Sequence, residues 1–402
     1  MVRLILFLCV YFALLLSAWA DPVGSDPLAG FDMDIPELEE KHLTLGGYAE
    51  YSGRYAPEKS EFIQSRQKLF AEADYSKDHL KGYFSASASY ESAAYQWSGT
   101  ATDLKLYEAY VGYDGDRFDI FAGNRMVRWG TTDGINPMDL INPTDHIHPV
   151  SSARSDSRLP VPLVNSIYTA DSFTFEMVII PEAAVNELSE SGSPWESRAL
   201  KKLRSAFDIA DEDEPDGAEA AARIYTTVKG YDFGFIYFNG YADNPKMKIK
   251  NGKRVPVYEE LEAYGVNFAK GLNKSTVRGE LSFKQSDIYE KDYVIGVLGF
   301  DRNFDDEEYL NIQLFADNAD NDYNGITYEL SDKYFRGDLQ VGIRGMHYVE
   351  DESGTSEIYG KYHYGDAITF SAGVAVIYGE MDSYYGQFGK NDYIYTEVKY
   401  SF

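Results

Sequence analysis

The chain has 402 residues, one cysteine, and 65 acidic against 37 basic side chains, so its formal net charge is −28. A chain this acidic lacks the basic face that nucleic-acid binding requires, which excludes nucleic acid as a partner. The lone cysteine, Cys9, lies in a leader that we expect to be removed. Disulfides, thiolate metal sites and thiol nucleophiles are therefore excluded from the mature protein.

The N-terminus has the layout of a secretory signal peptide. Arg3 supplies the positive charge, residues 4–16 are apolar, and residues 17–20 (Ser-Ala-Trp-Ala) form a small-residue cleavage site. The apolar run is shorter than the ~18–20 residues that a membrane-spanning helix needs. The expected parts are a signal peptide over 1–20 cleaved after Ala20, an acidic periplasmic lead-in over 21–42, and a folded domain over 43–402.

From residue 43 onward the chain is a series of short stretches in which apolar and polar residues alternate. In one of them, Val277, Leu281 and Phe283 share a face that is opposed by Arg278 and Lys284. This period of two is typical of β-strands with two different faces. The predicted strands are 43–52, 66–75, 80–90, 103–113, 117–127, 163–169, 172–181, 220–230, 231–242, 258–269, 274–285, 291–301, 307–317, 325–333, 337–349, 355–364, 367–378 and 392–402.

The connections between these strands alternate in length. Long ones (53–65, 91–102, 128–162, 182–219 and 243–257) are separated by tight turns, as expected when turns on the periplasmic side are tight and external loops grow freely. A soluble sandwich has no reason to keep this parity, although its strands would alternate in the same way. The prediction is an all-β, transmembrane antiparallel β-barrel of about 18 strands (16–20), with long external loops and short periplasmic turns. At that size a water-filled interior is expected.

Composition and the C-terminal strand favour the same fold. Tyr (34) and Phe (23) are abundant while mean hydropathy is −0.38, because each barrel strand shows lipid only half of its residues. In the last ten residues, Ile394, Val398 and Phe402 share one face. The terminal Phe resembles the signal by which outer-membrane barrels are recognised, which implies the barrel-assembly machinery as a partner.

The stretch 128–162 is the most unusual connection. It repeats an Ile-Asn-Pro-x-Asp turn at 135–139 and 141–145, in which proline fixes φ and the Asx side chains cap nearby backbone amides. Its apolar residues, such as Trp129 and Met138, would not remain in solvent. We therefore expect a compact loop that packs inward.

A set of residues in this loop and near the C-terminus is similar to a family of poorly characterised, porin-like outer-membrane barrels of Gram-negative bacteria, related to alginate-export-type barrels. Asn124 departs from the expected Gln. The similarity implies a porin-like or export channel and supplies no substrate. The matching residues are Gly123-Asn124-Arg125, Trp129-Gly130, Asp133, Asn136-Pro137, Asp139, Asn142-Pro143, Arg158-Leu159-Pro160, Ile180-Pro181, Phe388-Gly389, Asn391-Asp392 and Tyr400-Ser401-Phe402.

By analogy with porins, an inward-folded third loop sets the pore constriction, where opposed acids and bases orient solutes. The alternative is that the loop seals the barrel and its charges pair for stability. Acidic and basic residues both occur at predicted lumen positions, so the ion preference is left open. The candidate constriction residues are Arg125, Arg128, Asp133, Asp139, Asp145, Arg154, Arg158, Arg278 and Arg344.

Other motifs give no site. His146 and His148 have no third ligand in the sequence. Asp320, Asp322 and Asn324 match half of a calcium loop, but Ser331 stands where its bidentate Glu should be, so we expect an acidic turn and no bound metal. The connection 182–219 holds a predicted helix, Trp195 to Ile209, and we expect a solvated surface loop there in preference to a lid.

The function expected from these patterns is a passive channel or exporter for hydrophilic solutes, anionic ones included, in the outer membrane of a Gram-negative bacterium. It would need no cofactor, and the sequence has no Gly-x-Ser-x-Gly, His-Glu-x-x-His or phosphate-binding glycine loop that would indicate an enzyme. Its partners would be the lipid bilayer, lipopolysaccharide and a small hydrophilic solute. The alternative is a sealed barrel whose acidic loops bind a partner or divalent cations.

Overall fold

A computed structural model describes residues 42–96, 101–147, 157–206, 215–250, 253–286, 292–304, 307–319 and 323–402. The predicted signal peptide and nearly all of the lead-in lie outside this part of the chain. No helix in the described residues is long and apolar enough to cross a membrane.

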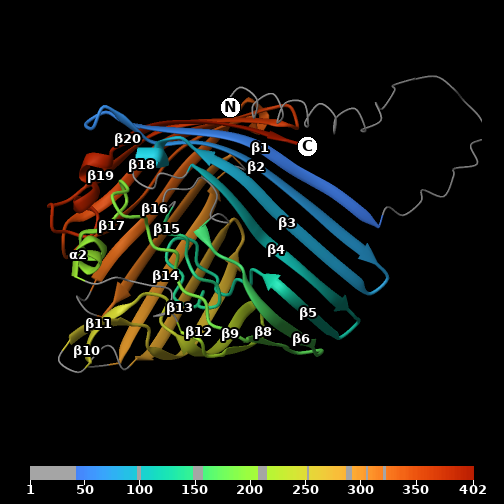
Figure 1. Ribbon diagram of the computed structural model, residues 1–402. Coiled ribbons are helices and arrows are strands. Elements are labelled where there is room, and N and C mark those ends of the chain that lie inside the picture. The colour runs from blue at the N-terminus through green and yellow to red at the C-terminus, as the bar shows by residue number, and fades with distance from the viewer. Residues whose placement is uncertain are drawn as a thin grey trace, which may run out of the picture.

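Eighteen antiparallel strands form one closed barrel (Figure 1). Each strand pairs with its neighbours in the sequence, β12 pairs with β9, and β20 closes the ring against β1. This confirms the predicted fold class, and every predicted strand overlaps an observed one. The barrel strands are β1 Leu43–Ala56, β2 Glu61–Lys77, β3 Leu80–Glu91, β4 Thr102–Asp114, β5 Phe118–Arg125, β6 Val161–Thr169, β7 Thr174–Ile180, β8 Glu219–Val228, β9 Tyr231–Tyr241, β12 Glu260–Leu272, β13 Ser275–Ser286, β14 Tyr293–Phe304, β15 Glu308–Asp317, β16 Tyr323–Tyr334, β17 Leu339–Tyr348, β18 Ser353–Tyr364, β19 Ile368–Tyr378 and β20 Tyr393–Ser401.

Smaller elements lie in the connections. A hairpin that was not predicted lies between β9 and β12, and α2 covers only part of the predicted helix over 195–209. Their bounds are β10 Lys246–Lys250, β11 Lys253–Val257, α2 Arg198–Ala206, and the 3-10 turns η1 Ala93–Gln96, η4 Phe335–Gly337 and η5 Gly386–Asn391.

The two faces of the wall follow the period-two pattern. On β20, Ile394 and Val398 are exposed on the outside while Tyr393 and Tyr395 are buried on the inside. The other strands repeat this, so a band of exposed Leu, Val, Ile, Phe and Tyr side chains encircles the barrel. An apolar surface of that extent is suited to lipid and would aggregate in water.

Connections at the two ends differ, although less regularly than predicted. At one end the turns are tight. Lys229 and Gly230 form a two-residue turn in which both φ angles are positive (51° and 73°), the geometry that glycine favours in hairpins. At the other end the prediction of a long first loop over 53–65 was wrong, because β1 and β2 continue as a paired hairpin and leave only residues 57–60 unpaired.

Candidate functional site

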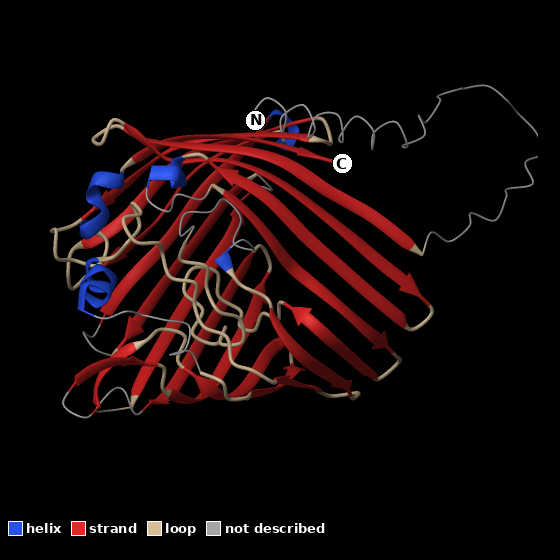
Figure 2. Cartoon of the chain, in the orientation of Figure 1, coloured by secondary structure: helices blue, strands red, loops and turns tan. Residues whose placement is uncertain are grey.

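The described parts of the connection between β5 and β6, residues 126–147 and 157–160, run into the barrel and not outward from its rim (Figure 2). Two asparagines of its Asn-Pro repeats hold its shape. The Asn142 side chain accepts a hydrogen bond from the Val127 N–H (2.7 Å) and donates one to the Leu159 carbonyl (2.8 Å). Asn136 donates to the Trp129 carbonyl (2.8 Å) and accepts from the Met138 N–H (3.2 Å). Both ends of the loop are thus fixed to its middle.

The apolar residues of this loop pack on the inner wall. Trp129 is 1% exposed and Met138 is fully buried. The Met138 side chain lies over Gly265 of β12, where an added Cβ would stand 2.0 Å from the Met138 Cε. The loop therefore has a dry attachment on one side of the lumen. The buried cluster consists of Val127, Trp129, Met138, Ile141, Val161, Leu163, Val178, Ile180, Ala221, Ile236, Phe238, Leu261 and Ala263.

The tip of the loop contacts the wall at β13 and β15. The Glu280 carboxylate accepts hydrogen bonds from the Thr131 and Thr132 N–H groups, the second at 2.8 Å. The Gln313 side-chain carbonyl accepts from the Gly134 N–H at 2.7 Å. Around the barrel, β7, β8, β9 and β12 lie between the loop's own strands and this contact. The loop therefore crosses the lumen to another part of the wall.

Some of the predicted constriction residues meet. Arg278 donates to the Thr131 carbonyl (2.8 Å) and forms an ion pair with Asp133 (3.3 Å), which joins loop to wall. Asp145 forms an ion pair with Lys105 of β4 (3.3 Å). Within the loop, Arg158 forms an ion pair with Asp139 (2.9 Å).

Of the other predicted residues, Arg344 and Arg125 lie apart from these contacts. Arg344 forms an ion pair with Glu357 (2.8 Å), far along the wall on β17 and β18. The Arg125 guanidinium donates to Asn165 (2.8 Å) and stands 4.0 Å from the centre of the Phe121 ring. Arg128 is exposed and lines a cavity of about 300 Å³ together with Arg158 and Asp139. Arg154 lies outside the described residues.

A second inward connection, between β7 and β8, was not expected; its described residues are 181–206 and 215–218. Asn391 donates to the Pro194 carbonyl (2.6 Å), and the Gln387 side chain accepts from the Arg198 N–H (2.9 Å). Trp195 packs on the buried cluster formed by residues of β1, β2, β18, β19 and β20. The preference for a solvated surface loop was therefore wrong. Trp195, next to Pro194, was the sequence feature that could have indicated this packing, since a tryptophan seldom stays in solvent.

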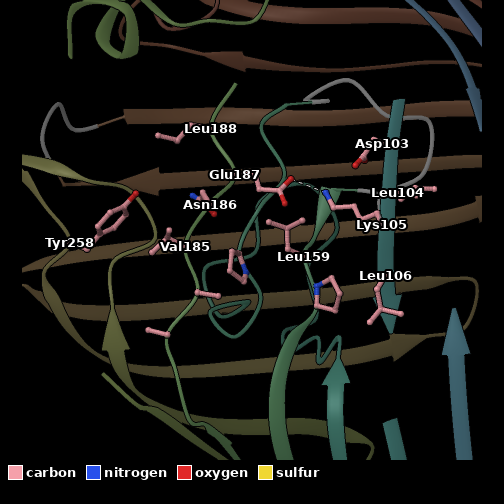
Figure 3. A pocket seen from close by; sticks show the side chains of 14 residues that line it. Asp103, Leu104, Lys105, Leu106, Leu159, Val185, Asn186, Glu187, Leu188 and Tyr258 are labelled. Atoms are coloured by element: carbon pink, nitrogen blue, oxygen red, sulfur yellow. Dashed lines mark hydrogen bonds and ion pairs between the residues drawn. The ribbon is translucent and has the colours of Figure 1, made fainter. Parts of the chain in front are cut away.

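The two connections are tied to each other and to β4. Lys105 bonds to Glu187 of the second connection at 2.8 Å and to Asp145 of the first at 3.3 Å. Beside this ion-pair cluster lies a cavity of about 680 Å³ (Figure 3). Burial is the largest influence on nearby His146 and lowers its pKa, which favours a neutral imidazole.

No group of three His, Cys, Asp or Glu side chains among the described residues is arranged to hold a metal. In the calcium-like stretch, the Asn324 N–H donates a hydrogen bond to the Glu350 carboxylate at 2.7 Å. Asn324 therefore ties the start of β16 to the connection that follows β17. Asp320 and Asp322, like His148, lie outside the described residues.

Comparison with known proteins identifies the family. Residues 51–385 match the family described as "Protein of unknown function (DUF1302)". The chain belongs to this family. No curated protein matches the sequence of this DUF1302 chain. Its relation to alginate-export-type barrels stays a prediction.

Solved structures share the fold of this DUF1302 protein. OccAB3 of Acinetobacter baumannii aligns with a TM-score of 0.57 and 10% identity, covering 90% of this chain and 98% of that chain. The outer membrane protein opdK of Pseudomonas aeruginosa aligns with a TM-score of 0.57 and 6% identity, again covering 90% and 98%. The fold is that of an 18-stranded barrel resembling outer-membrane porins, and at these identities the likeness extends to the fold alone.

Proposed function

We propose that this DUF1302 protein is an outer-membrane channel for passive diffusion or export of small hydrophilic solutes, with the loop 126–160 as its constriction. The observation that carries this proposal is the contact of residues 131–134 with Glu280 and Gln313 on another part of the wall. A loop attached on both sides narrows the lumen at a fixed place. The remaining opening must lie beside the loop.

Polar groups around the loop favour water in the lumen. Glu280 of β13 and Gln313 of β15 are polar residues of the inner wall and accept hydrogen bonds from the backbone of the loop tip. A polar inner wall is typical of barrels that hold water. It supports diffusion of hydrophilic solutes.

The charges beside the constriction support selection of solutes by the orientation of their dipoles and not by their net charge. Arg278, Arg158 and Lys105 each have a carboxylate partner. Exposed Arg128 adds a positive charge at the smaller cavity. Opposed charges across a narrow passage produce a transverse field that favours dipolar or zwitterionic solutes as well as anions.

Conductance in planar bilayers tests the proposal. The purified protein should produce stepwise openings, and Arg128→Glu should shift the reversal potential in a salt gradient toward cations. Arg336→Glu is the matched control because Arg336 lies in the β16–β17 turn at the far end of the barrel. Equal shifts from both variants would exclude Arg128 from the pore.

A sealed barrel is the second candidate, and the second inward connection favours it. Residues 181–198 of this connection lead from β7 to the β19–β20 connection on another part of the wall. Two crossing segments leave less open area than one. Bilayers that remain silent with correctly folded protein would support the sealed barrel, in which the acidic external connections bind a partner or divalent cations.

The placement in the membrane is part of the same proposal. The apolar outer band favours a lipid bilayer, and the tight turns favour a periplasmic location for their end of the barrel. We infer cleavage of residues 1–20, contact of the external loops with lipopolysaccharide, and recognition of β20 by the barrel-assembly machinery. Fractionation of cells that express the full chain tests the location.

A further inference from the structure

The barrel wall is low between β4 and β9. β5 has 8 residues and β7 has 7, whereas β4 has 13. A strand tilted by about 45° rises about 2.3 Å per residue, so seven residues rise only about 16 Å of the ~25 Å apolar band. The short strands cannot cover the band by themselves.

The missing height exposes one edge of β4. Its pairing with β3 extends from Tyr113 to Thr102, but its pairing with β5 stops at Ala109. Among the described residues, no strand pairs with the 102–108 segment on that side. Asn124 donates a hydrogen bond to the Tyr107 carbonyl (2.8 Å), which caps the point where pairing ends.

This free edge lies at the level of the lipid. Leu104 is 78% exposed and Leu106 is 49% exposed on the outer face of the edge segment. They continue the outward-facing apolar series of Val111 and Tyr113 on the same strand. The edge therefore belongs to the apolar band and not to a loop above it.

The larger cavity adjoins this edge. One side of it is formed by residues 103–106 of β4 and the opposite side by Tyr258, just before β12. Between them lie Leu159-Pro160 and residues 183–188 of the second inward connection. In Figure 3, Lys105 points from β4 toward Glu187, while Leu104 points away from the cavity. The cavity thus occupies a gap in the wall above the short strands, between the β4 edge and residues 183–188. We call this gap the notch.

The chemistry of the notch suits an amphipathic molecule. Unpaired backbone groups facing hydrocarbon cost several kcal/mol each, and they are tolerated at membrane depth where they line a water-filled cavity. Apolar side chains, among them Leu159, Val185 and Leu188, line part of the notch. The charged side chains that line it are Asp103, Lys105 and Glu187, so carboxylates outnumber ammonium groups there.

We propose that the notch between β4 and residues 183–188 is a lateral opening, through which amphipathic molecules with an uncharged or cationic polar end pass between the outer leaflet and the lumen. This inference rests on the membrane placement in the proposed function and not on conduction along the barrel axis. It adds a route for molecules that are dissolved in the membrane.

Quenching of a fluorophore by lipid tests the opening. Cys9, in the predicted signal peptide, is the only native cysteine, so single cysteines label cleanly. Bimane would be attached at Val185→Cys in the notch, Leu106→Cys on the lipid face, and Gln340→Cys on the inner face of β17. The proteins would be reconstituted in vesicles of phosphatidylcholine with brominated acyl chains. We expect strong quenching at 106, at least half as much at 185, and little at 340.

Two further arms make the result decisive. Leu106→Arg places a charge at the mouth of the notch and should reduce quenching at 185 at least twofold while bilayer conductance stays unchanged. An alkylammonium nitroxide should quench at 185 several-fold more than an alkyl sulfate nitroxide. Quenching at 185 as low as at 340 would overturn the lateral opening, and preference for the sulfate would overturn the assigned polar end. Quenching at 185 together with bilayers that show no conductance would overturn the axial channel and leave the lateral opening supported.

Discussion

Single side chains inside the barrel hold backbone segments that are distant in the sequence. Asn142 joins Val127, Leu159 and Arg125 through their backbone groups, and Glu280 holds residues 131 and 132. The Asn-Pro turns predicted a compact loop, because Asx capping is local chemistry. The contact with Glu280 was not predictable, since it depends on closure of the whole ring.

Asn142→Ala tests the inner support of the loop. The change leaves the buried Val127 N–H and Leu159 carbonyl without their partner, which costs about 1–3 kcal/mol of unfolding free energy. Urea unfolding in lipid vesicles, followed by tryptophan fluorescence, measures the change. Asn273→Gly is the control, because Asn273 lies in an exposed turn with a φ of 58°, where glycine is well suited. Equal losses in both variants would contradict the role of Asn142.

Asp243 should make stability depend on pH. Burial raises the pKa of Asp243, in the connection after β9, to about 6. The folded protein then binds a proton that the unfolded chain releases near pH 4, so this contribution to stability is complete below about pH 4 and is lost as pH rises through about 6. Asp243→Asn should therefore flatten the unfolding free energy across this range, as measured by urea titration at several pH values. Asp171→Asn, at an exposed turn, should leave the slope unchanged.

The positions of the strands were predictable from the local sequence pattern, whereas the courses of the connections were not. A period of two is set residue by residue, so all eighteen strands were predictable from sequence. The lengths of β1 and β2 were not, because residues 53–56 and 61–65 are paired through the register of their hairpin and show no clear apolar face. The inward course of residues 181–198 likewise depends on their contact with the β19–β20 connection.

Closure of the ring depends on a close approach of β1 and the last residue. The Gly47 N–H donates to the Phe402 carbonyl (3.1 Å), and the Phe402 N–H donates to the Gly47 carbonyl (3.0 Å). A Cβ on Gly47 would stand 2.4 Å from the Phe70 carbonyl oxygen and 2.9 Å from the Phe402 ring. Gly47→Val should therefore impair assembly, measured as loss of the heat-modifiable folded band on gels. Gly360→Ala is the control, since nothing lies within 4 Å of its added Cβ; an equal loss there would show general intolerance of the wall.

For the whole molecule, the balance between an open and a sealed barrel depends on how firmly the two inward connections are held. The first is attached by a dry cluster on β6–β9 and β12 and by hydrogen bonds on β13 and β15. These two attachments differ in kind. Removing the hydrogen-bonded one releases the tip while the apolar one keeps the loop in the barrel, so the passage beside the tip should widen.

Glu280→Ala is the variant that separates the two states. It removes the acceptor of the Thr131 and Thr132 N–H groups and leaves Met138 seated on Gly265. If the loop is a constriction, single-channel conductance should rise and brief current fluctuations should become more frequent, because a tip held by its remaining contacts, among them those with Arg278 and Gln313, is less firmly fixed. Glu350→Ala serves as the control, since Glu350 supports only the external end of β16 through Asn324. Unchanged conductance in folded Glu280→Ala protein would mean that solutes pass elsewhere, whereas new openings from a silent wild type would mean that this carboxylate holds the barrel closed.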